Sequence, residues 1–430
     1  MEFAFTAFAV LITLIFMRLP IALALMLVGC YGYASFVGWS PSFALTGQIL
    51  RDGAMSYTLS AVPLFIFMGT LISRAGLSRD IYAAANTFIG HRKGGLALAT
   101  IVASGGFAAV SGSSLATVGT MAKVSYPSMK KYNYSDQLSA ATIAAGGTLG
   151  ILIPPSIIMV IYGVMTQTHI GMLFAAGLVP GILGIVGYMI AARLVIARDP
   201  SAGPAGEKST WAQRFEAVQH IGGVVVLFGL IMGGIYGGVF TPTEAAGVGA
   251  FGALAFTWWR GKLNWQSFSE TMLETAGTTT MMFMVYIGAQ VFSEFVAFSG
   301  IADYLLAFIN DNSLSPLMVM AVMVLVYVVL GCLLEGLSMI LLTIPIFLPV
   351  VISMGFDPIW FGIVVVMCVE IGFITPPLGL NLFMLNAVVP EISTGTIYRG
   401  ILPFFLADLA RVALVILVPG IVLFLPNLLF

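Results

Sequence analysis

The sequence predicts an all-α polytopic membrane protein made of two inverted repeats, and three observations support this prediction. Only 17 basic and 18 acidic residues occur among 430, whereas about a quarter of a typical soluble chain is charged. Hydrophobic residues make up 60%, mean hydropathy is +1.05, and apolar runs reach the roughly 20 residues that span a bilayer. Landmarks of the first half also recur in the second. The net charge of −1 excludes nucleic-acid binding, which needs a basic surface.

Hydropathy predicts ten membrane-spanning segments, at residues 3–17, 20–38, 59–75, 137–163, 170–197, 220–239, 243–259, 277–298, 358–389 and 400–426. Two further apolar stretches are interrupted at their centres. Stretch 94–122 contains Gly105-Gly106 and Ser111-Gly112-Ser113-Ser114, and stretch 314–356 contains Glu335-Gly336. Each is predicted to be a re-entrant hairpin, because non-helical backbone at membrane depth must be covered by protein or line an aqueous cavity.

The basic residues predict the orientation in the membrane. If the amino terminus is periplasmic and the two hairpins open on opposite sides, fifteen of the seventeen Lys and Arg residues lie on the cytoplasmic side. The exceptions are Arg51, which is outside, and Arg411, which lies within the last span. The hydrophilic stretch 198–219 is expected to be a mobile cytoplasmic linker between the two halves.

Four landmarks recur in the same order at offsets of 222 to 224 residues. They pair Pro20 with Pro242, Gly76-Leu77 with Gly300-Ile301, Ser111-Gly112 with Glu335-Gly336, and Pro154-Pro155 with Pro376-Pro377. Inverted repeats with paired broken helices are typical of secondary transporters, which bind their substrate near the midplane where the repeats meet. The sequence therefore predicts such a transporter.

This repeat predicts that scaffold helices occupy 1–58 and 220–265, that a connecting helix and cytoplasmic linker occupy 170–219, and that a C-terminal helix occupies 396–430. The first half of a transport domain is predicted at 59–169, with an arm, the hairpin 94–122 and a broken helix at 137–163. The second half is predicted at 266–395, with an arm, the hairpin 314–356 and a broken helix at 358–389. The scaffold is expected to stay fixed while the hairpins and broken helices move as one body.

The two proline pairs mark the predicted ion-binding regions. Pro154-Pro155 and Pro376-Pro377 must each break a helix, because proline lacks a backbone donor and clashes with the preceding turn. The freed carbonyls lie beside small polar residues, namely Thr148, Gly150, Thr375 and Gly379. Carbonyl and hydroxyl oxygens at half-helix ends suit sodium. The tips Ser111–Thr117 and Glu335–Thr343 are expected to face these breaks. Ordinary kinks and close helix contacts are the alternative, and the duplication argues against it.

Several charged residues fall inside or at the edge of apolar segments, where an acid costs at least roughly 2.5–3.5 kcal/mol without a partner. Glu244 is one of them. Glu335 is a candidate ligand, a helix cap or a structural carboxylate, and Glu370 could be a buried structural acid. Asp408 and Arg411 are expected to pair along one helix. Anion recognition would use half-helix amino termini and tip amides. Lys123 could contribute, although it more simply belongs to the cytoplasmic set.

Two other functional classes fit the sequence less well. An intramembrane enzyme would need a base or an aspartyl dyad, yet His91, His169 and His220 lie near predicted membrane boundaries and no Gly-x-Gly-Asp motif occurs. A channel would not require an inverted pair of broken helices. We expect no cofactor, no His/Cys metal cluster and no ATP-binding motif. We also expect that the protein is not an enzyme.

Four motifs, at 106–117, 147–156, 233–246 and 372–381, resemble the large membrane subunit of the tripartite ATP-independent periplasmic (TRAP) transporters. The resemblance runs the whole chain. It implies a sodium-driven importer of organic acids in the bacterial inner membrane, working by an elevator mechanism. It also implies two partners, a periplasmic substrate-binding protein and a small membrane subunit that is a separate chain. A stand-alone sodium-coupled di- or tricarboxylate carrier is the alternative. The sequence leaves open whether the substrate is a dicarboxylate, a sugar acid or a sialic acid.

The same resemblance implies two sodium sites at the hairpin tips and the opposing breaks. Site 1 would comprise Ser111, Gly112, Ser113, Ser114, Thr148 and Gly150, and site 2 would comprise Gly336, Ser338, Gly372 and Thr375. Candidate substrate-binding residues are Ser114, Thr117, Pro154, Ser156, Glu335, Pro376 and Asn381.

Overall fold

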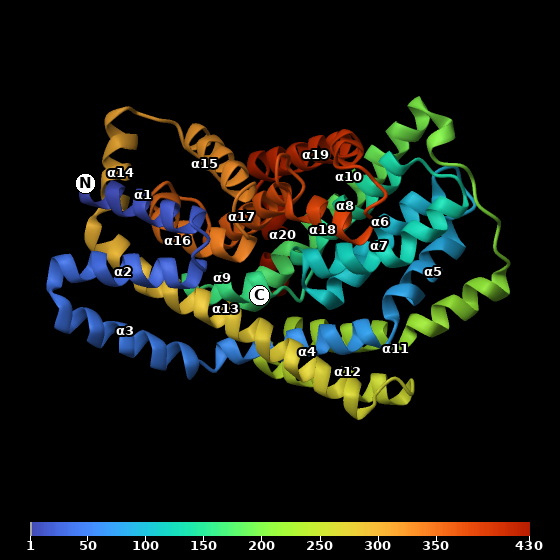
Figure 1. The fold of residues 1–430 in the computed structure, drawn as a ribbon, viewed down its shortest axis with the longest axis horizontal. Helices are drawn as coiled ribbons and strands as arrows, with labels where there is room; N and C mark the ends of the chain where they lie inside the picture. Colours follow the sequence, from blue (N-terminus) through green and yellow to red (C-terminus); the bar gives the residue numbers. More distant parts are fainter. Residues whose placement is uncertain (1) are drawn as a thin grey trace.

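A computed structural model describes residues 2–430, and helices account for most of this part of the chain (Figure 1). The first half contains α1 (Glu2–Phe16), α2 (Ile21–Val37), α3 (Trp39–Ala54), α4 (Ala61–Arg74), α5 (Leu77–Ile89), α6 (Gly95–Ser111), α7 (Ser114–Lys131), α8 (Asp136–Thr148), α9 (Ile157–Thr166) and α10 (Ile170–Arg198). The second half contains α11 (Trp211–Tyr236), α12 (Pro242–Trp259), α13 (Trp265–Ser299), α14 (Ile301–Asp311), α15 (Pro316–Gly331), α16 (Gly336–Ser353), α17 (Pro358–Phe373), α18 (Leu380–Val388), α19 (Thr394–Leu417) and α20 (Gly420–Leu429).

The order of helices repeats between the halves. Helices α5 and α14 each follow a glycine in the left-handed region, Gly76 at φ 85° and Gly300 at φ 68°, which only glycine adopts without strain. Two-helix hairpins follow, α6–α7 and α15–α16, and then the broken pairs α8–α9 and α17–α18. The predicted repeat is thus confirmed at the level of helix order. The opposite orientation of the halves in the membrane stays a prediction.

Five of the described helices are long and apolar enough to cross a bilayer, namely α10, α11, α13, α16 and α19. A sixth span results if α3 and α4, which are bent by 52°, count as one. Most of the hairpin and broken helices are shorter than the roughly 20 residues that a span requires. Such short helices fit segments that enter the membrane without crossing it.

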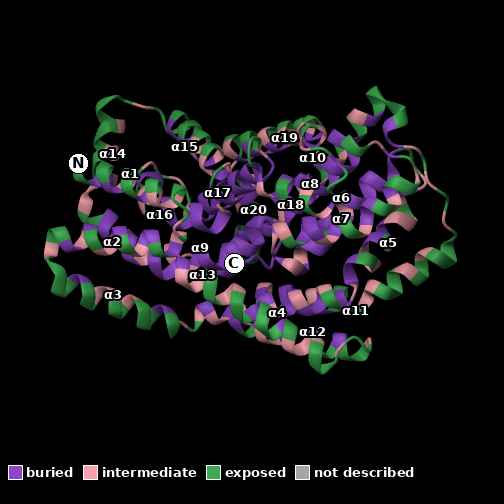
Figure 2. Cartoon of the chain, in the orientation of Figure 1, coloured by how far each residue is buried: buried purple, intermediate pink, exposed green. Residues whose placement is uncertain are grey.

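Helix α13 packs along α2 with very little space between the backbones (Figure 1). A Cβ atom added at Gly29 would lie 2.6 Å from the Phe292 amide nitrogen, and one at Gly32 would lie 2.4 Å from the Phe295 ring. Only glycine fits at these two positions. Figure 2 shows that the buried residues concentrate at the centre of the molecule, around α8, α17 and α9, whereas α3 at its margin is largely exposed.

The bounds of several predicted elements differ from the structure. The second arm of the first hairpin reaches Lys131 instead of residue 122, since its polar end remains helical after Pro127. Helix α3 was not among the predicted spans because its residues are amphipathic and only moderately apolar. The expected single C-terminal helix is two helices, α19 and α20, because the chain breaks at Val418-Pro419 and proline cannot continue the hydrogen-bond ladder.

The linker 198–219, expected to be mobile, is instead docked on the first hairpin. The Gly94 amide donates to the Gly203 carbonyl at 2.8 Å, and the Gly206 amide donates to the Gly90 carbonyl at 3.0 Å. Helix α11 then starts at Trp211, nine residues before the predicted span. The prediction from polarity did not foresee these contacts, because backbone groups of a polar segment can still pair with a neighbouring loop. The mobility of the linker stays a prediction.

Candidate functional site

The first hairpin tip lies directly against the first helix break. Ser113 caps α7, accepting a hydrogen bond from the Ala116 amide, and the following Ser114 hydroxyl donates to the Thr148 carbonyl at 3.4 Å. A Cβ atom added at Gly150 would lie 2.8 Å from the Ser113 carbonyl oxygen. The close approach therefore requires glycine at position 150. The structure confirms that this tip faces the break at the end of α8.

The second tip and the second break meet in the same way. A Cβ atom at Gly372 would lie 2.5 Å from the Cα atom of Gly331, and one at Gly336 would lie 2.4 Å from the Val369 side chain. Position 372 is related to Gly150 by the repeat offset of 222. The matched glycines show that both halves bring a hairpin end within backbone contact of the C-terminal part of a broken helix.

The hydroxyl groups at the two tips differ in their hydrogen bonding. At the first tip, the Ser111 and Thr117 hydroxyls lie 2.8 Å apart and Thr117 also donates to the Ser113 carbonyl. At the second, the Ser338 side chain is 1% exposed and its hydroxyl has no hydrogen-bond partner within residues 2–430. A buried polar atom without a partner is uncommon in native structures. The Ser338 hydroxyl is thus available to a ligand.

A cavity of about 430 Å³, here called the tip cavity, is lined by the two hairpin tips and by residues of α4 and α13. Both half-helix starts border it, α7 at Ser114 and α16 at Gly336. Helix amino termini carry partial positive charge and free amides, so they suit an anion. Glu335 also lines the cavity. It occupies the N-cap position of α16, but its side chain makes no capping hydrogen bond.

The structure brings together only part of the predicted substrate set. Ser114 and Glu335 line the tip cavity, as do Ser111, Gly112 and Ser113 of the first tip and Gly336 of the second. The other candidates, Thr117, Pro154, Ser156, Pro376 and Asn381, lie outside its lining. Two of them have partners elsewhere: the Ser156 hydroxyl donates to the Ile151 carbonyl at 2.5 Å, and the Asn381 amide group donates to the Ala144 carbonyl at 3.2 Å.

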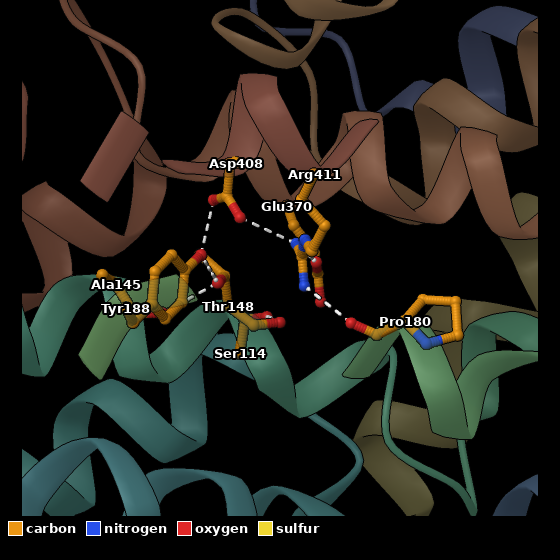
Figure 3. Close-up of polar contacts among 8 residues, drawn as sticks. All are labelled: Ser114, Ala145, Thr148, Pro180, Tyr188, Glu370, Asp408 and Arg411. Carbon is orange, nitrogen blue, oxygen red and sulfur yellow. Dashed lines mark hydrogen bonds and ion pairs between the residues drawn. The ribbon is translucent and has the colours of Figure 1, made fainter. Parts of the chain in front are cut away.

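A buried ion cluster lies behind the first break (Figure 3). One Arg411 guanidinium nitrogen contacts the Glu370 carboxylate at 2.5 Å and the Asp408 carboxylate at 2.8 Å. The Tyr188 hydroxyl donates to Asp408 at 2.5 Å and lies 2.7 Å from the Thr148 hydroxyl. The expected pairing of Asp408 with Arg411 is confirmed. The cluster also contains Glu370, and it connects both broken helices through α10 and α19.

Sequence reasoning missed two charged residues of the tip cavity, Arg74 and Glu274. They form an ion pair at 3.0 Å between α4 and α13. Arg74 was assigned only to the cytoplasmic set of basic residues, and Glu274 precedes the predicted span 277–298. Their positions in the repeat could not reveal the contact, because α4 and α13 are about 200 residues apart in sequence and meet only through tertiary packing.

Comparison with known proteins identifies relatives over nearly the whole chain. Residues 8–421 match the model of the family described as "Tripartite ATP-independent periplasmic transporter, DctM component". The chain is 34% identical to the C4-dicarboxylate TRAP transporter large permease protein DctM of Pseudomonas aeruginosa, covering 93% of each chain. It is 33% identical to the sialic acid protein SiaM of Vibrio cholerae, covering 96% of each, and 33% identical to the ectoine protein TeaC of Halomonas elongata, covering 98% of each.

Two solved structures share the fold. The YdaH transporter of Alcanivorax borkumensis superposes with a TM-score of 0.61 at 15% identity, and the match covers 88% of each chain. MtrF of Neisseria gonorrhoeae superposes with a TM-score of 0.60 at 13% identity, over 87% of this chain and 83% of that one. At such low identity these matches concern the arrangement of helices alone.

Proposed function

The chain belongs to the family of TRAP transporter large membrane subunits, and on this premise we propose that it is a sodium-coupled importer of organic acids. Its relatives are transport permeases, so the protein is a transporter rather than an enzyme, and a multi-pass protein of the bacterial inner membrane. The proposal extends to its working parts: a periplasmic binding protein delivers the substrate, a small membrane subunit accompanies this chain, and the hairpins move against the scaffold as an elevator.

The observation that carries the proposal is the matched contact of two hairpins with two helix breaks around one cavity. Gly150 meets Ser113 and Gly372 meets Gly331 at positions related by the repeat. Broken helices supply free carbonyls for a cation and half-helix amino termini for an anion. The proposed sodium sites use these oxygens, and the proposed substrate carboxylate faces the starts of α7 and α16. A substrate and its coupling ions would then be held by the same mobile segments.

Uptake into proteoliposomes tests the proposal. The vesicles would contain this chain and its small subunit, with the binding protein outside and a defined sodium gradient across the membrane. We expect accumulation of a labelled organic acid that needs both sodium and the binding protein. Accumulation that proceeds equally well with potassium on both sides would contradict sodium coupling, and accumulation without the binding protein would favour a stand-alone carrier.

Replacing Ser338 by alanine should weaken sodium dependence without impairing folding. The buried hydroxyl has no protein partner, so its removal breaks no hydrogen bond of the described structure. We expect the sodium concentration for half-maximal uptake to rise about five- to tenfold, the effect of losing one polar contact. Ser113→Ala is a less specific variant, because Ser113 also caps α7.

Ser353→Ala on the same helix is the matched control, since the Ser353 hydroxyl bonds only the Val350 carbonyl, away from the tip. It should leave the sodium dependence unchanged. If Ser338→Ala and Ser353→Ala have the same sodium requirement as the parent, Ser338 is not a ligand.

The orientation can be tested by labelling single cysteines placed near Lys130 and near Asn312. The charge distribution predicts that the first is reached only from the cytoplasm and the second only from the periplasm. Impermeant maleimide added to intact and to inverted vesicles gives the measurement. Labelling of both positions from one side would contradict the inverted arrangement of the halves.

A further inference from the structure

A second cavity of about 640 Å³ adjoins the tip cavity, and five of its twelve lining residues are basic. The two cavities share Ser73 and Arg74 at the end of α4. The walls of the second cavity come from the α4–α5 junction, the middle of α7 and the C-terminal end of α12. Its basic residues are Arg74, Arg79, Lys123, Arg260 and Lys262. We call this cavity the basic vestibule.

Two of these cations are already neutralised and hold the walls together. Arg74 bonds Glu270 at 2.6 Å and Glu274 at 3.0 Å, which fixes the end of α4 to α13. Arg260 bonds Asp80 at 2.5 Å and also donates to the Ala75 carbonyl at 3.1 Å. These contacts join the scaffold helix α12 to the α4–α5 junction. Because Arg74 and Arg260 are both paired with acids, neither of them has a free charge for a ligand.

The other three cations are exposed and form no ion pair within residues 2–430. Arg79 lies at the start of α5, Lys123 on α7 and Lys262 just after α12. Three uncompensated charges that converge on one cavity raise the local concentration of anions. A guanidinium group can also bind a carboxylate through two parallel hydrogen bonds.

We propose that Arg79, Lys123 and Lys262 form an exit subsite that receives the carboxylate of the substrate as it passes from the tip cavity towards the cytoplasm. This inference rests on the proposed function and on the cytoplasmic placement of these residues. Topology alone requires basic residues on that side of the membrane, but not their convergence on one cavity. Basic pockets between helices can also bind lipid headgroups; the residues shared with the tip cavity favour the substrate.

The first test measures the electrostatic potential at the shared wall. Ser73→Cys, in a background with Cys30 and Cys332 replaced by serine, would be labelled with anionic and with cationic methanethiosulfonate reagents. The vestibule variant R79Q/K123Q/K262Q should lower the anionic-to-cationic rate ratio about tenfold at low salt, and less at high salt. The matched control R92Q/K131Q/K208Q removes three exposed basic residues outside the vestibule and should change the ratio less than about twofold. Equal ratios in the two variants would overturn the proposal.

The second test is substrate exchange in proteoliposomes, with labelled succinate and N-acetylneuraminate as probes. The vestibule variant should raise the half-saturation concentration on the cytoplasmic side about three- to thirtyfold and leave the periplasmic value unchanged. If the parent protein transports neither probe, the proposed function fails for both of these acids, and the labelling ratio alone decides whether the anion subsite exists. Loss of bound anionic phospholipid from the variant with unchanged exchange would assign the vestibule to a lipid headgroup and overturn the proposal.

Discussion

Replacing Arg411 by methionine is expected to destabilise the protein by about 3–5 kcal/mol, the usual effect of removing one partner from a buried ion pair. Arg411 is 5% exposed, and the two carboxylates that contact it, Glu370 and Asp408, are fully buried. Without the guanidinium group, two acids would remain side by side in the protein interior. Since folded proteins are stable by only about 5–15 kcal/mol, we expect a large loss of monodisperse protein in detergent and a much lower unfolding temperature.

Two further variants test whether the loss of stability comes from the uncompensated buried charges. Arg399→Met removes an exposed arginine from the same helix, α19, and should behave like the parent. The triple variant E370Q/D408N/R411M removes all three charges and should recover much of the stability, because a neutral buried cluster has no uncompensated charge. If R411M alone is as stable as the parent, the cluster does not hold the broken helices together.

The second large effect is expected for valine at Gly150 or Gly372. A Cβ atom would lie 2.8 Å from the Ser113 carbonyl oxygen in the first case and 2.5 Å from the Gly331 Cα atom in the second. Valine must therefore push the hairpin away from the helix break. Overpacking typically costs about 1–3 kcal/mol, so sodium-dependent uptake should fall about ten- to hundredfold.

Gly229→Val on α11 is the control, since a Cβ atom at Gly229 would meet nothing within 4 Å. Uptake at several sodium concentrations, normalised to the folded protein in the vesicles, separates transport from stability. Both site variants should remain folded, because the overpacking cost of about 1–3 kcal/mol is smaller than the usual stability of a folded protein. Normal uptake by Gly150→Val and Gly372→Val would show that close contact of tip and break is not needed.

Much of the fold could be predicted because its determinants are local. The proline pairs 154–155 and 376–377 end helices wherever they occur, and the polar interruptions of the hairpins are visible in hydropathy. Gly76 and Gly300 mark matching turns, and both adopt positive φ. The contact between tips and breaks followed from the repeat, since a duplicated pattern of small residues indicates paired close approaches.

The rest depends on contacts between distant segments. Nothing near Glu370 in the sequence indicates that it meets Arg411, because the contact requires α17 and α19 to pack side by side. The position of Arg74 in the tip cavity also depends on packing between distant segments, because the acids that pair with Arg74 lie on α13. Helix α3 was not predicted for another reason: its mixed polarity keeps its hydropathy below what a hydropathy window detects, although α3 packs against α13.

The docked linker also limits how far the proposed elevator can travel. Gly206 is bonded to Gly90 at the base of the first hairpin, and α11 begins at Trp211. Five residues of extended chain span at most about 17 Å. The hairpin base can therefore separate from the start of α11 by no more than this distance unless the bond at Gly206 breaks. In the proposed elevator, the linker would therefore act as a tether between the base of the first hairpin and the start of α11.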